Sequence, residues 1–201
     1  MKPVIVGITG ASGAILAKMA VDRLIELGRE TVVICTPAGR QVWEQEMATP
    51  FEETASTWLR TGLVSEYQVD DLCAPVASGT YPVRGVVVIP CSMATLSAIA
   101  HGASANLLER AADVCLKEGR PLVVVPRETP LSAIHLQNML TLAQLGVAIV
   151  PPMPAFYLHF TSIQEMARSI ACRALAALGI DEALEAHQIY RAKGETSGEN
   201  W

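Results

Sequence analysis

The sequence predicts one α/β domain with a Rossmann-like, three-layer architecture, in which helices cover both faces of a mostly parallel, doubly wound sheet. Short apolar runs rich in valine and isoleucine recur along the chain, as in strands that are buried on both faces. Segments with helical periodicity separate these runs, and this alternation is typical of parallel strands joined by right-handed crossovers. The length of 201 residues fits a single domain with a substantial core.

The expected elements follow this alternation in order. In the first half we expect a strand at 4–8, a helix from about Ala14 to Leu27 capped by Gly28, a strand at 31–35 and a helix at 38–47. The pattern assigns nothing firmly in 50–82, a mixed segment interrupted by Pro50, Pro75, Gly79 and Pro82. The second half predicts strands at 86–89, 122–125 and 147–150, and helices from about Ser92, at 105–117, at 131–145 and at 161–178. We therefore expect a domain over residues 1–180 and a polar C-terminal tail over 181–201.

The composition narrows the class of partners. Hydrophobic residues make up 51% of the chain and charged residues 17%, which suits a buried parallel sheet and extensive contacts between subunits. We therefore expect a homo-oligomer. The formal net charge is -5, whereas nucleic-acid-binding surfaces usually carry a basic excess, so no nucleic-acid partner is expected.

Cysteines and apolar stretches bear on the compartment. The five cysteines are scattered without a CxxC pair, and the four histidines show no metal-ligand spacing, so we predict neither a disulfide framework nor a metal site. A reducing cytoplasm is the simplest compartment. The chain enters its first strand pattern within three residues, so we expect no signal peptide. The apolar stretch 147–158 contains three prolines and is too short to span a bilayer, so no membrane insertion is expected.

The first expected strand runs into its helix through a turn with Gly7, Gly10 and Gly13. Backbone amides and the helix dipole at such a turn attract phosphate, so we expect an anion site here. The spacing is Gly-x-x-Gly-x-x-Gly rather than that of a dinucleotide site, and Cys35-Thr36 replaces the acidic residue that would hold an adenosine ribose. A mononucleotide such as FMN fits better, although a turn that only packs helix against sheet has the same pattern.

The strand at 86–89 ends in Pro90-Cys91-Ser92, which opens the next helix. Ser92 can act as an N-cap alone or can also contact a ligand, and the segment by itself does not separate these interpretations. Cys91 is more consistent with a buried structural thiol than with a nucleophile, because no histidine or acidic residue lies nearby in sequence to activate it.

The strand at 122–125 is followed by Arg127 and Glu128, which stand between two prolines. Open α/β sheets bind ligands beyond the carboxyl ends of their strands, so this pair is a candidate site. A solvated surface turn is an equal alternative on these residues alone. Arg110 and Lys117 share one face of the preceding helix, where they either converge with Arg127 on an anion or pair with acidic neighbours along the helix.

Six sequence blocks stand in an order that points to a known family. They are Thr9-Gly-Ala-Ser-Gly-Ala14, Pro90-Cys-Ser-Met, Glu109-Arg-Ala-Ala-Asp-Val-Cys-Leu-Lys-Glu118, Val125-Pro-Arg-Glu-Thr-Pro130, His135-Leu-Gln-Asn-Met-Leu140 and Pro151-Pro-Met-Pro-Ala-Phe-Tyr157. Together they resemble the UbiX-type flavin prenyltransferases, from residue 4 to about 180. The resemblance implies metal-independent transfer of a dimethylallyl group from dimethylallyl phosphate to N5 and C6 of reduced FMN. The product would be the prenylated cofactor of a UbiD-type aromatic-acid decarboxylase, and the enzyme would be a homo-dodecamer.

The resemblance also implies roles for individual residues. FMN would contact Gly10, Ala11, Ser12, Thr36, Ser92, Met93, Ala94, Thr95 and Arg127. The prenyl phosphate would be held by Lys117, Arg127, Glu128, Tyr157 and Arg173. The catalytic residues would be Ser12, Glu46, Lys117 and Glu128. The cations and the Tyr157 hydroxyl would stabilise the leaving phosphate, and Ser12 and Glu128 are the candidates for proton transfer.

Two other functions remain open at this point. A non-catalytic flavin carrier, or an accessory subunit of a decarboxylase, would keep the FMN site. A flavin-dependent cysteine decarboxylase would have a similar fold. Those enzymes carry a substrate-clamp motif with Pro-x-Met-Asn, whereas this chain reads Pro152-Met153-Pro154 without the asparagine. The chain also departs from the usual family residues at Pro37, Gln137 and Leu158-His159, and its tail lacks an Arg-Trp pair. These departures bear on prenyl-donor preference, lid closure and subunit contacts more than on FMN.

Overall fold

Six parallel strands form the centre of the molecule, in the order β3-β2-β1-β4-β5-β6. The structure is a computed structural model and describes residues 2–189. The strands are β1 (Val4–Ile8), β2 (Thr31–Cys35), β3 (Val64–Glu66), β4 (Gly85–Cys91), β5 (Leu122–Pro126) and β6 (Ala148–Ile149). Because β1 pairs with both β2 and β4, the order of strands reverses between these neighbours. The predicted doubly wound sheet is confirmed, and the described strands all pair in parallel.

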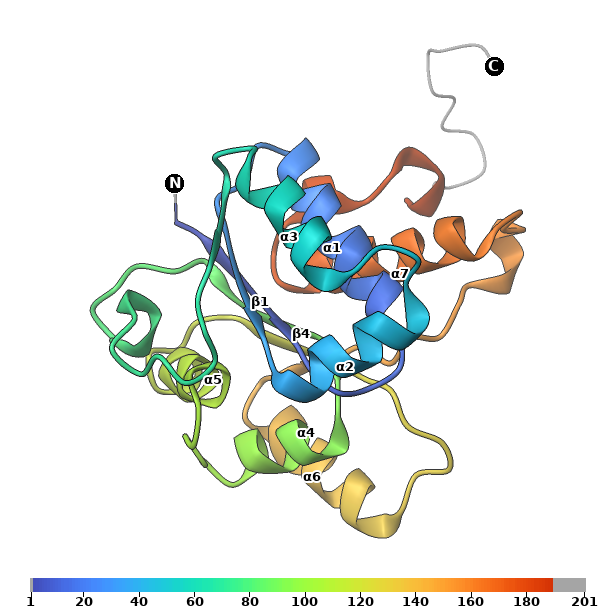
Figure 1. Cartoon of the computed structure of the whole chain (residues 1–201). Coiled ribbons are helices and arrows are strands. Elements are labelled where there is room, and N and C mark those ends of the chain that lie inside the picture. The colour runs from blue at the N-terminus through green and yellow to red at the C-terminus, as the bar shows by residue number, and fades with distance from the viewer. Residues whose placement is uncertain (1, 190–201) are drawn as a thin grey trace.

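Helices cover both faces of this sheet and complete three layers (Figure 1). One face carries α1 (Ala14–Glu26), α3 (Phe51–Leu59) and α7 (Ile163–Ala177), and the other carries α4 (Met93–Ala100), α5 (Leu107–Lys117) and α6 (Ala133–Gln144). The side chains of β1 alternate between the two cores, with Val4 and Val6 in one and Ile5 in the other. α2 (Pro37–Glu46) adds Trp43 to the first core. Among residues 2–189, no helix is both long and apolar enough to cross a membrane.

The segment 50–82 is where the structure adds most to the sequence pattern. It contains α3, the short strand β3 and a 3-10 turn, η1 (Pro75–Ala77). The buried side of α3 consists of Phe51, Thr54, Ala55 and Trp58. The two aromatic rings pack edge-to-face with Trp43, which anchors α3 against the end of α2.

The first part of the predicted tail is folded. Two 3-10 turns, η3 (Asp181–Ala183) and η4 (Ala186–Gln188), follow α7. Arg23 of α1 donates a hydrogen bond from Nε to the Ala183 carbonyl at 3.1 Å, and the Gln188 side-chain amide donates to the Ser169 carbonyl at 3.0 Å. Residues 181–189 therefore pack on the domain, while the remaining tail, 190–201, lies outside the described residues.

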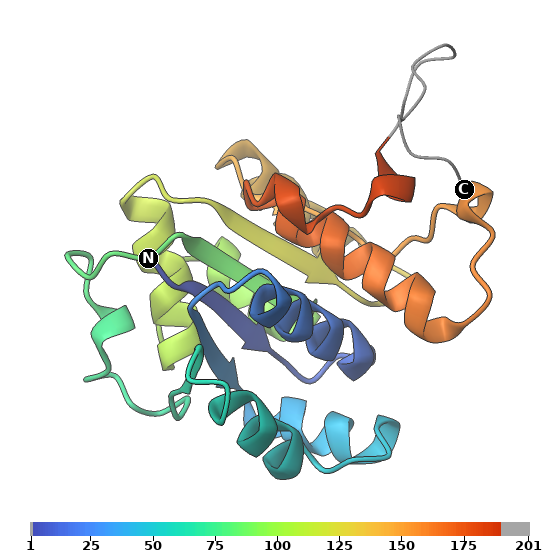
Figure 2. The same ribbon diagram turned by 90° about the horizontal axis from the view of Figure 1, so that it is seen from above.

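The carboxyl ends of the strands lie along one edge of the sheet, as the arrowheads in Figure 2 show. The pairing of β1 with β4 extends only to Gly7 and Val88, and the register between β4 and β5 shifts after Val88. The turns that follow β1 and β4 are consequently held by interactions other than the regular ladder. They meet at the reversal point of the strand order, where open α/β sheets place their ligands.

Candidate functional site

A buried hydroxyl joins the turns that follow β1 and β4. Thr9 is 1% exposed, and its Oγ1 donates to the Pro90 carbonyl at 2.8 Å while accepting from the Ser92 amide at 2.8 Å. These contacts set the Gly10–Ser12 turn beside the start of α4. Thr9 belongs to one of the six sequence blocks, but the sequence predicted no role for it. The local signal for such a role was a hydroxyl residue directly before a glycine turn.

The start of α4 has the geometry of a capped helix. Ser92 is the N-cap, and its Oγ accepts from the Thr95 amide at 3.3 Å and donates to the Thr95 hydroxyl at 3.1 Å. The first amides of a helix have no partner within the helix, so those of Met93 and Ala94 can serve a ligand at the carboxyl edge. The N-cap interpretation of Ser92 is confirmed, and contact with a ligand stays a prediction.

Arg127 connects the turn after β5 to both of these turns. Its backbone amide donates to the Cys91 carbonyl at 3.2 Å, and its side-chain Nε donates to the Ser12 carbonyl at 3.1 Å. The side chain is half-buried. Glu128, the next residue, is exposed, and its carboxylate accepts from the Thr129 amide at 2.9 Å. The candidate site after β5 is therefore physically continuous with the first two turns.

Glu46 occupies the N-terminus of α1. Its Oε2 accepts from the backbone amides of Gly13 and Ala14, each at 2.8 Å, and Gly13, the N-cap, has no side chain of its own to do so. Partial burial raises the pKa of this carboxyl, but the hydrogen bonds from Ser12, Gly13 and Ala14 and the nearby charge of Arg127 outweigh it and lower the pKa. The amides of Gly13 and Ala14 are thus engaged by the chain's own carboxylate, and contact of a ligand with the rest of this turn stays a prediction.

Thr36 brings the end of β2 to the same place. Its amide donates to the Ile8 carbonyl at 2.9 Å, and its side chain caps α2 by accepting from the Gly39 amide at 3.0 Å. A Cβ at Gly10 would lie 2.6 Å from the Ala38 Cβ, so the first turn can approach α2 only because residue 10 is glycine. The residues predicted to contact FMN therefore all follow β1, β2, β4 or β5 at the carboxyl edge.

Lys117 lies at the other edge of the sheet. It is the last residue of α5, just before the turn that enters β5, whereas Arg127 directly follows the carboxyl end of β5. Its Nζ forms an ion pair with Glu118 at 2.5 Å, and Arg110 pairs with Asp113 at 2.8 Å. Within one chain, the convergence of Arg110 and Lys117 with Arg127 does not occur, and both cations have the ordinary acidic neighbours of a helix surface.

Two further predicted phosphate ligands face outward from their own chain. Tyr157 belongs to a 3-10 turn, η2 (Phe156–Leu158), and is 76% exposed. Arg173 lies on the exposed side of α7. Neither side chain is enclosed by its own chain, so the part of the site that would hold the prenyl phosphate is open in a single copy.

The buried thiols behave as structural groups. Cys91 is fully buried, which raises the pKa of its thiol far above the ordinary value, and burial raises the pKa of the Cys35 thiol to about 12. This agrees with the prediction that Cys91 is not a nucleophile. Within the described part of the chain, no group of three or more His, Cys, Asp or Glu side chains is arranged to hold a metal ion.

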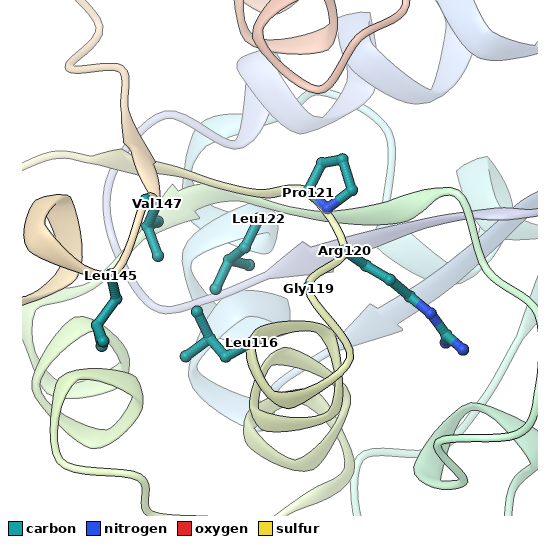
Figure 3. Close-up of a pocket in the computed structure, with 8 residues that line it drawn as sticks. Leu116, Gly119, Arg120, Pro121, Leu122, Leu145 and Val147 are labelled. Atoms are coloured by element: carbon teal, nitrogen blue, oxygen red, sulfur yellow. The ribbon is translucent and has the colours of Figure 1, made fainter.

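A hollow lies at the amino edge of the sheet, between the end of α5, the start of β5 and the turn that follows α6 (Figure 3). Leu116, Leu122, Leu145 and Val147 point into it from α5, from β5 and from the turn that follows α6. The side chain of Arg120 extends away from it and donates to the carbonyls of Tyr81 and Gly79 at 2.8 Å and 2.6 Å. The hollow is separate from the three joined turns at the carboxyl edge.

Known proteins identify the family of this chain. The Flavoprotein family model matches residues 1–173. A curated flavin prenyltransferase UbiX of Halalkalibacterium halodurans is 45% identical over 195 residues, which cover 94% of this chain and 92% of the relative. The chain belongs to the flavoprotein family, among the UbiX flavin prenyltransferases. The resemblance inferred from the six sequence blocks is confirmed.

Solved structures of UbiX-family proteins share this fold over nearly the whole chain. AnUbiX (PadA1), in complex with FMN and dimethylallyl pyrophosphate, is 35% identical with a TM-score of 0.85, and the match covers 97% of this chain and 99% of that one. A dodecameric, FMN-dependent UbiX-like decarboxylase of Escherichia coli O157:H7 is 41% identical with a TM-score of 0.83, and the match covers 89% of this chain and 95% of that one.

Proposed function

We propose that this protein is a flavin prenyltransferase, which transfers a dimethylallyl group from dimethylallyl phosphate to N5 and C6 of reduced FMN. The observation that carries the proposal is the junction of three turns at the reversal point of the sheet, where Arg127 donates to Ser12 and Glu46 lies beside both. A non-catalytic flavin carrier would need the flavin contacts but would have no use for a cluster of charged groups beside them.

Of the N-termini of α1 and α4, that of α4 is the better place for the FMN phosphate. The first amides of α1 are engaged by Glu46, whose negative charge would repel a phosphate. The start of α4 has Ser92, Thr95 and the amides of Met93 and Ala94, and no carboxylate is bonded there among the described contacts. We therefore assign the FMN phosphate to α4, and the ring system to the side of Gly10, Ala11, Ser12, Thr36 and Arg127.

Proton transfer at the flavin requires groups near Ser12. Ser12 donates a hydrogen bond to Glu46, and the lowered pKa keeps this carboxylate ionised at neutral pH. The ionised Glu46 carboxylate can accept the proton of the Ser12 hydroxyl, so this hydroxyl can receive a proton and pass it on. Glu128, exposed on the other side of Arg127, is the second candidate for moving a proton, either of the flavin or of the phosphate.

The cationic side chains would serve the phosphate that leaves the prenyl donor. When both substrates are bound, N5 of the reduced flavin would bond to the allylic carbon as its C–O bond breaks, and the phosphate would leave with the electron pair. Ring closure at C6 would then need a proton added at the dimethylallyl double bond and the C6 proton removed, so that the protons balance. Arg127, Arg173, Lys117 and the Tyr157 hydroxyl would stabilise the charge that accumulates on the phosphate.

The position of Lys117 requires a second copy of the chain for this role. Lys117 and Arg127 lie at opposite edges of the sheet, so Lys117 can reach a phosphate beside Arg127 only from another subunit. The charged face around Arg127 is also incomplete without a neighbour, because Tyr157 and Arg173 are exposed. We therefore propose that the site lies between copies and that each copy supplies Lys117 to a neighbour.

The surface carries the apolar area that such an assembly needs. Large apolar side chains are exposed on α6, in the segment between α6 and α7, and at the start of α7; they are Ile134, Leu136, Leu140, Leu145, Met153, Phe156, Tyr157 and Ile163. Since a UbiX-like relative forms a dodecamer, we propose the same assembly here. A UbiD-type decarboxylase would receive the product, and a reducing cytoplasm suits the free cysteines of the described chain.

The test is anaerobic incubation of the protein with reduced FMN and dimethylallyl phosphate, followed by mass analysis of the released flavin. We expect a flavin that has gained one five-carbon unit, and a parallel incubation with the diphosphate measures the donor preference. A flavin that binds but remains unmodified with both donors would contradict the enzyme and favour the carrier. Absence of flavin binding would contradict both functions.

A further inference from the structure

We propose that Thr9 is a positioning residue for the flavin, because its hydroxyl fixes the distance between the two turns that hold opposite parts of FMN. The inference rests on the proposed function, which assigns the Gly10–Ser12 turn to the ring system and the start of α4 to the phosphate. Thr9 itself is 1% exposed and makes no contact with the ligand in this account.

The ladder between β1 and β4 does not extend into these turns. β1 and β4 pair only as far as Gly7 and Val88, and the register between β4 and β5 is irregular from Val88 to Cys91. Pro90 also has no amide hydrogen with which to pair. The Pro90 carbonyl and the Ser92 amide are instead both bonded to the Thr9 hydroxyl, each at 2.8 Å.

The two hydrogen bonds of the Thr9 hydroxyl join the ring-binding turn to the start of α4. Thr9 directly precedes Gly10, the first residue of the ring-binding turn, and its partner Ser92 is the N-cap of α4. One hydroxyl that donates to residue 90 and accepts from residue 92 bonds the start of α4 directly to the first turn. Both partners lie more than eighty positions away in the sequence, at separations of 81 and 83. A shift of this turn would move the Met93 and Ala94 amides with it.

The test compares FMN affinity in Thr9→Val, Thr9→Ser and Thr31→Val, measured by quenching of flavin fluorescence. Valine keeps the shape of Thr9 and removes the hydroxyl, so we expect the dissociation constant for FMN to rise about tenfold, the effect of a hydrogen-bond loss of about 1.4 kcal/mol. Thr9→Ser keeps the hydroxyl and should restore the affinity to within about threefold of wild type.

Thr31→Val is the matched control. Thr31 is also buried, at 2% exposure, and its hydroxyl donates to the Arg29 carbonyl at 3.1 Å, but it lies at the amino edge of the sheet. This variant should lose thermal stability without a change in FMN affinity. A merely structural role for Thr9 would make the two valine variants behave alike.

Each outcome bears on the proposal. Wild-type FMN affinity in Thr9→Val, with lowered thermal stability, would overturn the positioning role and leave the proposed function intact. If Thr9→Val does not fold, Thr9→Ala and Thr9→Ser replace it, since both lack the methyl group and differ only in the hydroxyl; equal affinities in that pair would overturn the proposal. A wild-type protein that binds no FMN would overturn the proposed function, and the Thr9 inference with it.

Discussion

The Glu46 side chain caps the N-terminus of α1, because the N-cap residue of that helix has no side chain. The N-cap of α1 is Gly13, and the carboxylate that accepts its amide hydrogen comes from 33 positions away at the end of α2. An anion near a helix N-terminus is stabilised by the helix dipole and by the unpaired amides. The same carboxylate is bonded to Ser12, so one residue both stabilises α1 and conditions a candidate catalytic hydroxyl.

The Glu46→Gln variant should show this double role. At neutral pH we expect a loss of about 0.5 kcal/mol of stability, together with slower product formation, because the charge at the start of α1 is gone. The pKa of Glu46 is lower in the folded protein than that of an ordinary glutamate, so its contribution is present above the ordinary pKa and is lost as the pH falls through the folded pKa. Thermal unfolding should therefore differ between the proteins at pH 7 and converge in acid. An unchanged difference in acid would contradict the ionised cap.

The Glu128→Gln variant tests the second carboxylate. Glu128 is exposed and bonded only locally, to the Thr129 amide, among the described contacts. Its loss should leave folding and FMN affinity unchanged but slow product formation by more than about tenfold, since a positioned proton-transfer group typically contributes about 100- to 10,000-fold. Glu53→Gln, an exposed carboxylate on α3, is the control. Wild-type turnover of Glu128→Gln would remove this residue from the mechanism.

The sequence indicated the short blocks of the site but not the bonds between them. Gly10–Ser12, Ser92 and Arg127 stand directly after apolar runs, so their edge of the sheet followed from the fold class. The Thr9 and Glu46 contacts join residues 81 and 33 positions apart, and no local pattern encodes such pairs. The sequence did not show that Lys117 and Arg127 lie at opposite edges of the sheet, because this depends on α5 ending at the amino edge.

At the scale of elements, α4 is the helix on which the phosphate assignment depends. Its cap is Ser92, and its first-turn amides face the carboxyl edge. α5 offers a close comparison, because its N-cap Asn106 accepts from the Glu109 amide at 3.0 Å in the same way.

Removing the two caps should have the same effect on stability and different effects on binding. Ser92→Ala and Asn106→Ala should each cost about 1 kcal/mol of stability, as lost N-caps usually do. Only Ser92→Ala should weaken FMN binding, by about tenfold, because it also removes a hydrogen-bond partner of the phosphate. Calorimetry and a flavin titration measure the two quantities. Equal FMN affinity in both variants would contradict the assignment of the phosphate to α4.

The strands and helices with strong periodicity were predictable, and the weakly patterned ones were not. β1, β2, β4 and β5 are buried throughout and mostly apolar, so their runs stood out in the sequence. α3 buries residues 51, 54, 55 and 58, which is helical spacing, but its threonines and aromatic residues favour helix only weakly. β3 has three residues and lies at the edge of the sheet, too short for its pattern to be read.

At the scale of the whole molecule, the exposed apolar side chains indicate that one chain is part of a larger assembly. Ile134 is 71% exposed on α6 and Phe156 is 83% exposed beside Tyr157. Burial of such side chains between subunits would remove apolar area from water and enclose Tyr157 at the same time. Assembly and activity should therefore be lost together.

The Ile134→Glu variant tests this link. A charge at this position should disfavour burial against a neighbour, so we expect smaller species in light scattering, a folded chain by circular dichroism, and loss of product formation. Leu59→Glu is the control, because Leu59 is 42% exposed on α3, on the opposite layer of the domain. A fully active, monomeric Ile134→Glu protein would contradict a site shared between copies.

Product formation by mixed oligomers tests whether Arg127 of one copy and Lys117 of another act on the same prenyl phosphate. Lys117→Ala and Arg127→Ala copies, each inactive alone, are co-expressed, purified together and supplied with reduced FMN and dimethylallyl phosphate. With random mixing, about a quarter of the sites pair an intact Arg127 with an intact Lys117 from a neighbour, so about a quarter of wild-type activity should return. Mixed oligomers that stay as inactive as either variant alone would show that Arg127 and Lys117 of different copies do not share a site.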